Sequence, residues 1–187
     1  MRVIAGSHKG RKLKSVPGKQ TRPTSDKVKE AVFHTIGPFF TGGKCLDLFA
    51  GSGSLGIEAL SRGMEQAIFI DQYPKAVQTI KRNLQLLNIM KPDIKVKRMS
   101  ADRALQFLAK RKSKFDLILI DPPYLKVDYE SLLHTILQLN LLKENSIIYC
   151  EHQSIENLPS LKPQCDIIKQ TSYGKTTRIT LYRYLFS

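Results

Sequence analysis

Residues 47–56 read DLFAGSGSLG, and we expect them to join a strand to a helix. Glycine allows a backbone to approach a ligand closely, and a helix N-terminus presents N–H groups that have no partner within the helix. The spacing of Gly51, Gly53 and Gly56 fits the fingerprint of dinucleotide-binding folds. Asp71 lies 20 residues after Gly51, where such folds place an acid that binds ribose hydroxyls. The stretch therefore predicts an open α/β sheet with a ligand site at the carboxyl ends of its strands.

From residue 44 onward, predicted strands and helices alternate. Strands are expected at 44–49, 66–71, 94–99, 115–120, 146–151, about 165–170 and 178–185. Helices are expected at about 25–36, 53–62, 74–88, 101–111 and 129–140. Several strands are nearly continuous apolar runs, which is typical of parallel strands covered on both faces. The pattern predicts an α/β fold with a doubly wound, seven-stranded, mostly parallel sheet, whose last two strands form an antiparallel hairpin at one edge.

The charge of the chain points to a polyanionic partner. The sequence has 30 Lys and Arg residues against 16 Asp and Glu residues, which gives a formal net charge of +14. Residues 1–30 hold nine basic and two acidic groups, and so half of the net charge. We therefore predict nucleic-acid binding, with contacts from five basic residues: Arg2, Lys9, Arg11, Lys12 and Arg22.

The same end of the chain is predicted to form an extension that contacts the substrate. We assign residues 1–24 to this basic extension and residues 25–187 to the α/β domain. Within the extension, two short strands at 2–6 and 11–16 are expected to form a β-hairpin around a Gly/Lys turn.

Acids at the strand ends favour S-adenosylmethionine over a nicotinamide dinucleotide as the cofactor. Asp47 ends the first strand, where its carboxylate would repel a pyrophosphate but suits the ammonium and sulfonium groups of S-adenosylmethionine. Asp71 can accept from ribose hydroxyls and Asp102 from the adenine amine, although an ordinary loop acid and a helix N-cap are the alternatives for these two. The predicted cofactor site comprises Asp47, Ala50, Gly51, Gly53, Asp71, Ala101, Asp102 and Asp121.

The fourth predicted strand ends in Asp121-Pro122-Pro123-Tyr124, which brings this tetrapeptide to the same sheet edge as the glycine loop. The exocyclic amine of guanine or adenine is a weak nucleophile because its lone pair is delocalised into the ring. Asp121 and the Pro122 carbonyl can hold that amine toward a methyl donor, and the prolines stiffen the turn. Tyr124 offers a face on which a flipped base can stack. We predict that Asp121, Pro122 and Tyr124 catalyse transfer by positioning, with either Asp121 or water taking the proton.

The sequence resembles the bacterial 16S rRNA (guanine966-N2)-methyltransferases almost from end to end. The segments that carry the resemblance are 2–6, 9–13, 22–33, 46–63 and 121–124. The glycine loop and the tetrapeptide occur widely among amino-methyltransferases. The N-terminal hairpin with Arg22-Pro23-Thr24 is the part that is specific to this family.

The resemblance implies the Rossmann-like class I methyltransferase fold with a short N-terminal hairpin extension. It implies that a target base is flipped toward Asp121 and Tyr124, and that Arg22-Pro23-Thr24 packs over cofactor and base, which adds Thr24 to the cofactor site. The implied reaction is methyl transfer from S-adenosylmethionine to the N2 amine of a guanine in small-subunit ribosomal RNA. The RNA is expected within an assembled or assembling 30S particle, and the enzyme is expected to be a monomer.

Three other functions fit parts of the sequence. An adenine-N6 methyltransferase acting on DNA or RNA would share the tetrapeptide. A basic RNA-binding assembly factor that has lost catalysis would not need an intact tetrapeptide. A nicotinamide-dependent oxidoreductase would share the glycine loop, but Asp47 disfavours it.

The cysteines indicate a reducing compartment. Cys45, Cys150 and Cys165 are too widely spaced for a disulfide framework or a zinc site, and we expect Cys45 and Cys150 to be buried free thiols. The histidines lack metal-ligand spacing, so no metal is expected. Because the sequence shows neither a signal peptide nor an apolar run long enough for a bilayer, we expect a cytoplasmic protein with no membrane partner.

Overall fold

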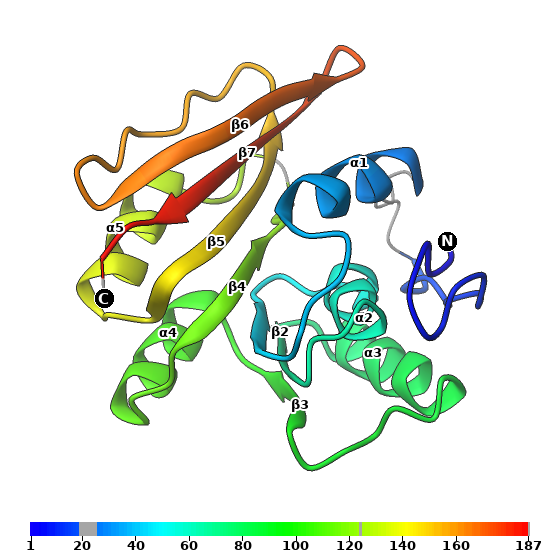
Figure 1. Cartoon of the computed structure of the whole chain (residues 1–187). Coiled ribbons are helices and arrows are strands. Elements are labelled where there is room, and N and C mark those ends of the chain that lie inside the picture. The colour runs from blue at the N-terminus through cyan, green and yellow to red at the C-terminus, as the bar shows by residue number, and fades with distance from the viewer. Residues whose placement is uncertain (19–25, 124, 187) are drawn as a thin grey trace.

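The computed structural model describes residues 1–18, 26–123 and 125–186 (Figure 1). The helices are α1 (Asp26–Ile36), α2 (Ser54–Ser61), α3 (Pro74–Leu86), α4 (Ala101–Lys110) and α5 (Tyr129–Gln138). The strands are β1 (Lys44–Asp47), β2 (Gln66–Asp71), β3 (Ile94–Arg98), β4 (Phe115–Ile120), β5 (Leu142–Gln153), β6 (Cys165–Tyr173) and β7 (Thr177–Tyr184). Every helix and strand predicted after residue 25 is present, and β5 begins four residues earlier than predicted.

The seven strands form one sheet in the order β3-β2-β1-β4-β5-β7-β6. The strands from β3 to β5 are parallel, and β7 lies antiparallel between β5 and β6. Residues 174–176 join β6 to β7 in a turn far shorter than the crossover that parallel neighbours need. The predicted topology, with its antiparallel hairpin at one edge, is confirmed. The strand order reverses between β1 and β4, which is the point where open α/β sheets bind ligands.

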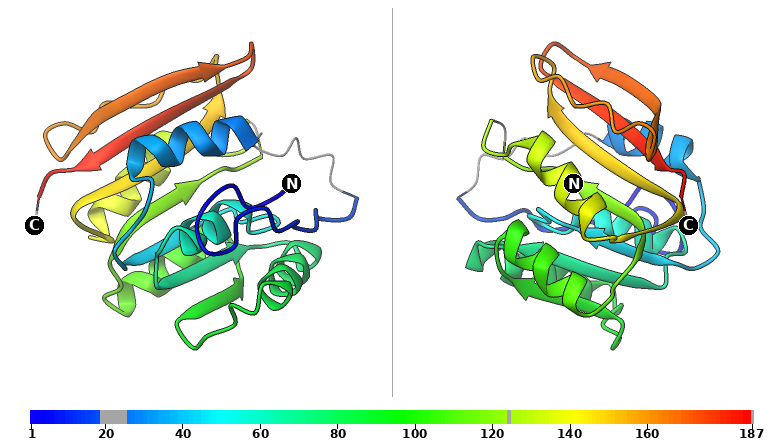
Figure 2. Two further views of the ribbon diagram at one scale, coloured as in Figure 1. Left: turned by 45° about the vertical axis from the view of Figure 1, so that its right-hand side comes forward. Right: turned by 90° about the vertical axis from the view of Figure 1, so that its left-hand side faces the viewer.

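Helices cover both faces of the sheet (Figures 1 and 2). One apolar core contains Phe33 of α1, Ile57 of α2 and Ile80 of α3. The other contains Leu105 of α4 and Leu133 of α5. Strand residues alternate between these two cores, because successive side chains of a strand point to opposite faces. All three cysteines are buried free thiols, as predicted for two of them.

The N-terminal segment differs from the predicted hairpin. Its two arms pair antiparallel through one isolated bridge, between Arg2 and Lys12, and a few backbone hydrogen bonds, but they form no regular strands. The backbone N–H groups of Ile4 and Ala5 donate instead to the two carboxylate oxygens of Glu58, at 2.8 and 3.0 Å. Because these donors are taken by a side chain of α2, a regular ladder cannot extend along the segment. The prediction of regular strands at 2–6 and 11–16 is therefore wrong, whereas the predicted reversal with antiparallel pairing of the two arms is present.

Glu58 is the centre of a buried charge cluster that joins this segment to α1 and α2. The Glu58 side chain is fully buried, and it pairs with Arg62 at 2.8 Å and with Lys29 at 3.6 Å. Lys29 also donates to the carbonyl of Arg2, at 2.6 Å, and to the hydroxyl of Ser54, at 3.0 Å. Burial lowers the pKa of Lys29, while the Glu58 carboxylate acts in the opposite direction. The cluster fixes the start of α2 and the N-terminal segment in one arrangement.

Further contacts lock the segment against α2 and α3. The Asn83 side chain accepts from the Lys14 N–H and donates to the Lys14 carbonyl and to the Ser52 carbonyl in the glycine loop. Gly6 has a φ of +85°, and a Cβ there would lie 1.7 Å from the Ser61 carbonyl oxygen. A side chain is thus excluded at Gly6, and Asn83 links the segment directly to the glycine loop.

Candidate active site

A cavity of about 820 Å³ lies at the carboxyl ends of the parallel strands. Its walls come from the N-terminal segment, the glycine loop after β1, the end of β2, the start of α4, the turn after β4, the loop and first turn that begin α5, and the end of β5. The N-terminal segment lies at this end of the molecule (Figure 2, left). The glycine loop and the Asp121-Pro122-Pro123 turn therefore open onto one shared cavity.

The charged residues that line the cavity are mainly acidic, although the chain as a whole is strongly basic. Six of its described lining residues are acidic: Asp47, Asp71, Asp102, Asp121, Asp128 and Glu151. Lys126 is the one basic side chain among the described lining residues. These acids would repel a pyrophosphate, so the site does not suit a dinucleotide. It suits a ligand that carries positive charge and hydrogen-bond donors.

Asp47 lies at the end of β1, directly below the glycine loop. It is 2% exposed, and its Oδ2 atom accepts from the Gly56 N–H at 3.0 Å. A Cβ at Gly56 would lie 2.4 Å from the Phe69 ring and 3.0 Å from Asp47 Oδ2, so only glycine allows this approach. Burial raises the pKa of Asp47 to about 7. The hydrogen bond from the Gly56 N–H acts in the opposite direction, and the nearby Asp71 carboxylate adds to the increase. A cationic ligand would favour the charged form of this acid.

Asp71 connects the end of β2 to the glycine loop. Its Oδ2 atom accepts from the Gly51 N–H and its Oδ1 atom accepts from the Tyr73 N–H, each at 2.9 Å. A carboxylate can accept about four hydrogen bonds in total, so ribose hydroxyls could still be bound. Gly51 and Gly53 have φ values of +55° and +81°, which favour glycine at both positions of the loop.

Asp102 lies in the first turn of α4 and lines the cavity together with Ala101. Ser100 occupies the N-cap position, so the alternative role of Asp102 as the N-cap is excluded. The Asp102 carboxylate is exposed at the end of α4 where the helix dipole favours negative charge.

The turn after β4 brings part of the tetrapeptide into the cavity. Asp121 is half-buried, Pro122 is buried and Pro123 is exposed, and all three line the cavity. Asp121 follows β4, the neighbour of β1, and the turn therefore lies at the switch point of the sheet. Tyr124 falls outside the described residues, as do Arg22 and Thr24.

Glu151 is a cavity residue that the sequence-based site did not include. It lies near the end of β5, within a run of buried residues from 146 to 152, and it is 5% exposed. The Tyr149 hydroxyl donates to Glu151 Oε2 at 2.7 Å, and the Tyr129 hydroxyl donates to the Glu151 carbonyl. The sequence indicates it only as an acid that ends the strand predicted at 146–151, near the expected site, where a plain strand-end acid is the alternative. Met1, Ser15 and Val16 are further cavity residues with no such signal.

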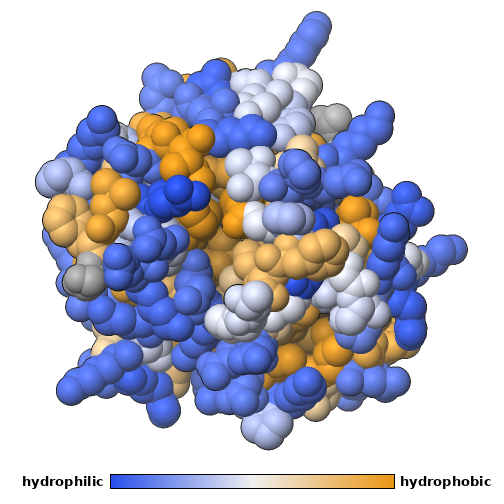
Figure 3. All heavy atoms as spheres, in the orientation of Figure 1, coloured by the Kyte–Doolittle hydropathy of each residue, from blue (hydrophilic) through white to orange (hydrophobic). Residues whose placement is uncertain are grey.

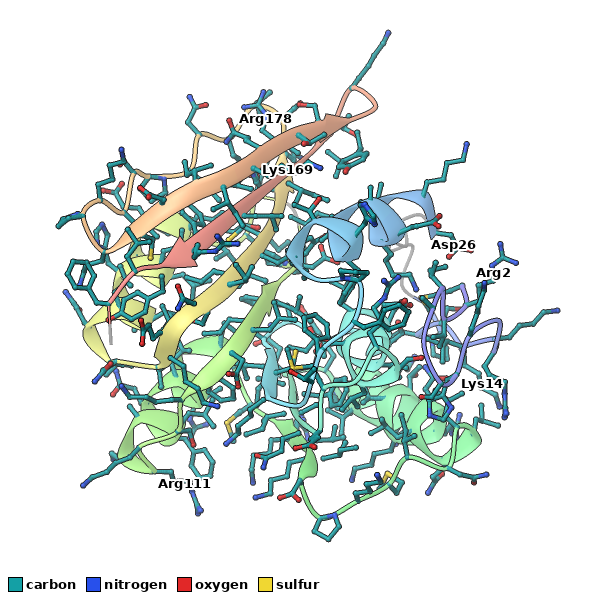
Figure 4. The ribbon with its side chains drawn as sticks, viewed as in Figure 1. Arg2, Lys14, Asp26, Arg111, Lys169 and Arg178 are labelled. Atoms are coloured by element: carbon teal, nitrogen blue, oxygen red, sulfur yellow. The ribbon has the colours of Figure 1, made fainter. Side chains whose placement is uncertain are left out.

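The four described residues of the predicted RNA-contacting set are exposed on the outside of the N-terminal segment. Arg2 pairs with Asp26 at 2.9 Å (Figure 4). Arg11 donates to the Leu86 carbonyl at 2.8 Å. Lys9 and Lys12 are exposed. The face of the molecule seen in Figure 3 is covered largely by hydrophilic residues. The basic groups are therefore on the surface, whereas the acids gather in the cavity.

Comparison with known proteins gives a consistent set of similarities. The family model described as "Conserved hypothetical protein 95" matches residues 1–183. A Bacillus subtilis protein named "Putative rRNA methyltransferase YlbH" is 48% identical over 183 residues, which cover 98% of each chain. The ribosomal RNA small subunit methyltransferase D of Haemophilus influenzae is 36% identical over 98% of this chain and 92% of its own.

A solved structure is similar over the whole chain. The Escherichia coli protein described as "Putative methyltransferase yhhF" superposes with a TM-score of 0.85 at 30% identity. The match covers 100% of this chain and 99% of the other. The likeness therefore includes the N-terminal segment as well as the α/β sheet.

Proposed function

The chain belongs to the family of ribosomal RNA small subunit methyltransferase D, whose model is described as "Conserved hypothetical protein 95", and from this premise we propose its reaction. The protein transfers a methyl group from S-adenosylmethionine to the exocyclic N2 amine of a guanine in small-subunit ribosomal RNA. The observation that carries the proposal is the acid-lined cavity shared by the glycine loop and the Asp121-Pro122-Pro123 turn.

The residues of the cavity fit S-adenosylmethionine. The buried Asp47 carboxylate suits the positive groups of this cofactor, which supplies a methyl group already activated by its sulfonium. Asp71 offers acceptors for ribose hydroxyls, and Asp102 offers an acceptor for the adenine amine. The backbone from Ala50 to Gly53 allows close approach at the helix N-terminus. Thr24 completes the proposed cofactor site.

Asp121 and the Pro122 carbonyl hold the target amine. Each accepts one N–H hydrogen of the amine, which turns the nitrogen lone pair toward the methyl donor. The methyl donor is already activated, so no covalent enzyme intermediate is needed. Holding the amine and the methyl group in line therefore supplies much of the rate enhancement. One proton must leave the nitrogen as the N–C bond forms, and the Asp121 carboxylate is the acceptor that the cavity provides. Tyr124 stacks on the flipped base.

The basic N-terminal segment binds the RNA backbone beside the cavity. Lys9 and Lys12 are exposed for phosphate contacts, and Arg2, Arg11 and Arg22 add to the positive surface. Because Met1, Ser15 and Val16 line the cavity, RNA docked on this segment is placed next to the site of transfer. The substrate is ribosomal RNA in an assembling or assembled 30S particle. The enzyme acts on it in the cytoplasm as a monomer.

The variant Asp121→Ala tests the proposal. We expect methyl transfer to small-subunit RNA to be lost, because the amine loses its acceptor, while S-adenosylmethionine still binds through Asp47, Asp71 and Asp102. Transfer is measured as N2-methylguanosine by mass spectrometry of RNA nucleosides, and cofactor affinity by calorimetry. Wild-type product that contains N6-methyladenosine instead would favour the adenine-N6 alternative. Loss of cofactor binding in the variant would remove Asp121 from the catalytic role.

A further inference from the structure

A second carboxylate lies beside Asp121 in the cavity. Ile120 of β4 pairs with Cys150 of β5, so Asp121 and Glu151 follow this pair on neighbouring parallel strands. Residues opposite each other in parallel strands point to the same face, and the strands lie about 4.8 Å apart. Both acids line the cavity. Their carboxylates can therefore contact adjacent atoms of one ligand.

Glu151 is held in place by two buried tyrosines. Tyr149 donates from its hydroxyl to Glu151 Oε2 at 2.7 Å, and Tyr129 donates to the Glu151 main-chain carbonyl. Burial raises the pKa of Tyr149, and the charges of Glu151 and Asp121 raise it further, so its hydroxyl remains a donor. Because a carboxylate accepts about four hydrogen bonds, a carboxylate fixed in this way can also accept from a ligand.

The edge of a guanine base matches two adjacent acceptors. Guanine presents the N2 amine and the ring N1–H side by side, and both are donors. Adenine presents its N6 amine beside a ring N1 that carries a lone pair and no hydrogen. A carboxylate facing that lone pair would repel it, whereas the same carboxylate would accept from the N1–H of guanine.

The tetrapeptide alone does not distinguish the two bases, because Asp121 and Pro122 accept from an exocyclic amine of either one. We infer that Glu151 accepts a hydrogen bond from the ring N1–H of the target base, and so selects guanine over adenine. The inference rests on the proposed function. It gives the buried acid near the end of β5 a role in specificity, next to the acid directly after β4 that holds the reacting amine.

The variant Glu151→Gln tests the inference with a base analogue. 2-Aminopurine keeps the amine at position 2 but has no hydrogen on N1. Small-subunit RNA is prepared with either guanine or 2-aminopurine at the methylated position, by ligation of a synthetic oligonucleotide and assembly with ribosomal proteins. For the wild type we expect transfer to guanine to be faster by on the order of 10- to 100-fold, the range of a charge-assisted hydrogen bond. In Glu151→Gln that ratio falls toward one, because an amide can donate to N1 as well as accept from it.

The control variant is Glu156→Gln, which makes the same acid-to-amide change outside the described cavity lining and keeps the wild-type ratio. If Glu151→Gln transfers to neither base, the affinities for the two RNAs are compared with S-adenosylhomocysteine bound. The fluorescence of 2-aminopurine, which rises when the base leaves its stack, reports binding without turnover. A ratio unchanged from the wild type, in transfer or in affinity, overturns the role of Glu151. Wild-type enzyme that yields no N2-methylguanosine overturns the proposed function itself.

Discussion

Replacing Asp47 with asparagine should stabilise the cofactor-free protein at neutral and alkaline pH while it weakens cofactor binding. Burial raises the pKa of Asp47 to about 7, against an ordinary value of 3.8. The folded protein therefore binds this proton more tightly than the unfolded chain does. The contribution of Asp47 to the free energy of unfolding is greatest below pH 4 and is lost as the pH rises to about 7.

The size of the effect follows from the difference in pKa. A difference of about three units, at 1.36 kcal/mol per unit, corresponds to about 4 kcal/mol as an upper estimate. Asparagine has the same shape, cannot ionise, and keeps an oxygen that can accept from the Gly56 N–H. The variant should therefore gain stability over the wild type as the pH rises from 5 to 8. The affinity for S-adenosylmethionine should fall, because the positive groups of the cofactor lose their counter-charge.

Urea unfolding of the cofactor-free wild type and of Asp47→Asn, at several pH values from 5 to 8, measures the first effect. Calorimetric titration with S-adenosylmethionine measures the second. The wild-type affinity should also rise with pH up to about 7 and level off above it, whereas the affinity of the variant should not follow this profile. A stability difference between the two proteins that stays constant from pH 5 to pH 8 would refute the assignment of the raised pKa to Asp47.

Two further perturbations test the N-terminal segment. Glu58→Gln should lower the free energy of unfolding by about 3–5 kcal/mol, because the buried Lys29 and Arg62 lose their counter-charge. A loss below about 1 kcal/mol in urea unfolding would show that the cluster does not hold the segment. In the double variant Lys9→Ala, Lys12→Ala, the slope of log RNA affinity against log salt concentration should become shallower by about 1.5, since two exposed cations are removed. An unchanged slope would exclude these lysines from the docking surface, and the cofactor affinity serves as the control.

The α/β sheet could be predicted because its signals are local. Apolar runs such as residues 115–120 give the parallel strands, and the short turn at 174–176 permits only an antiparallel neighbour. The N-terminal segment could not be predicted in the same way. Its alternation resembles a hairpin, but Ile4 and Ala5 donate to Glu58, which lies more than 50 residues away in the chain. A partner of that kind has no periodic signal in the sequence.

The candidate site was predictable to the extent that its residues stand at strand ends. Asp47, Asp71 and Asp121 could be found because parallel strands deliver their carboxyl ends to one edge of a sheet. The importance of Glu151 depends on two facts that only the folded chain contains. One is the register that places it beside Asp121, and the other is the hydroxyl of Tyr149 that holds it.

Under the proposed function, the separation of charge accounts for how a basic protein binds RNA and admits only a base to its active site. Exposed lysines attract phosphates over a distance of about 8 Å at physiological salt, so they gather the RNA backbone onto the surface. The cavity acids repel the same phosphates, and Glu151 is buried enough that solvent screens it little. A phosphate that approaches the cavity therefore meets increasing repulsion. A flipped base with its donor edge forward meets acceptors instead, and this contrast makes the base the part of the RNA that enters.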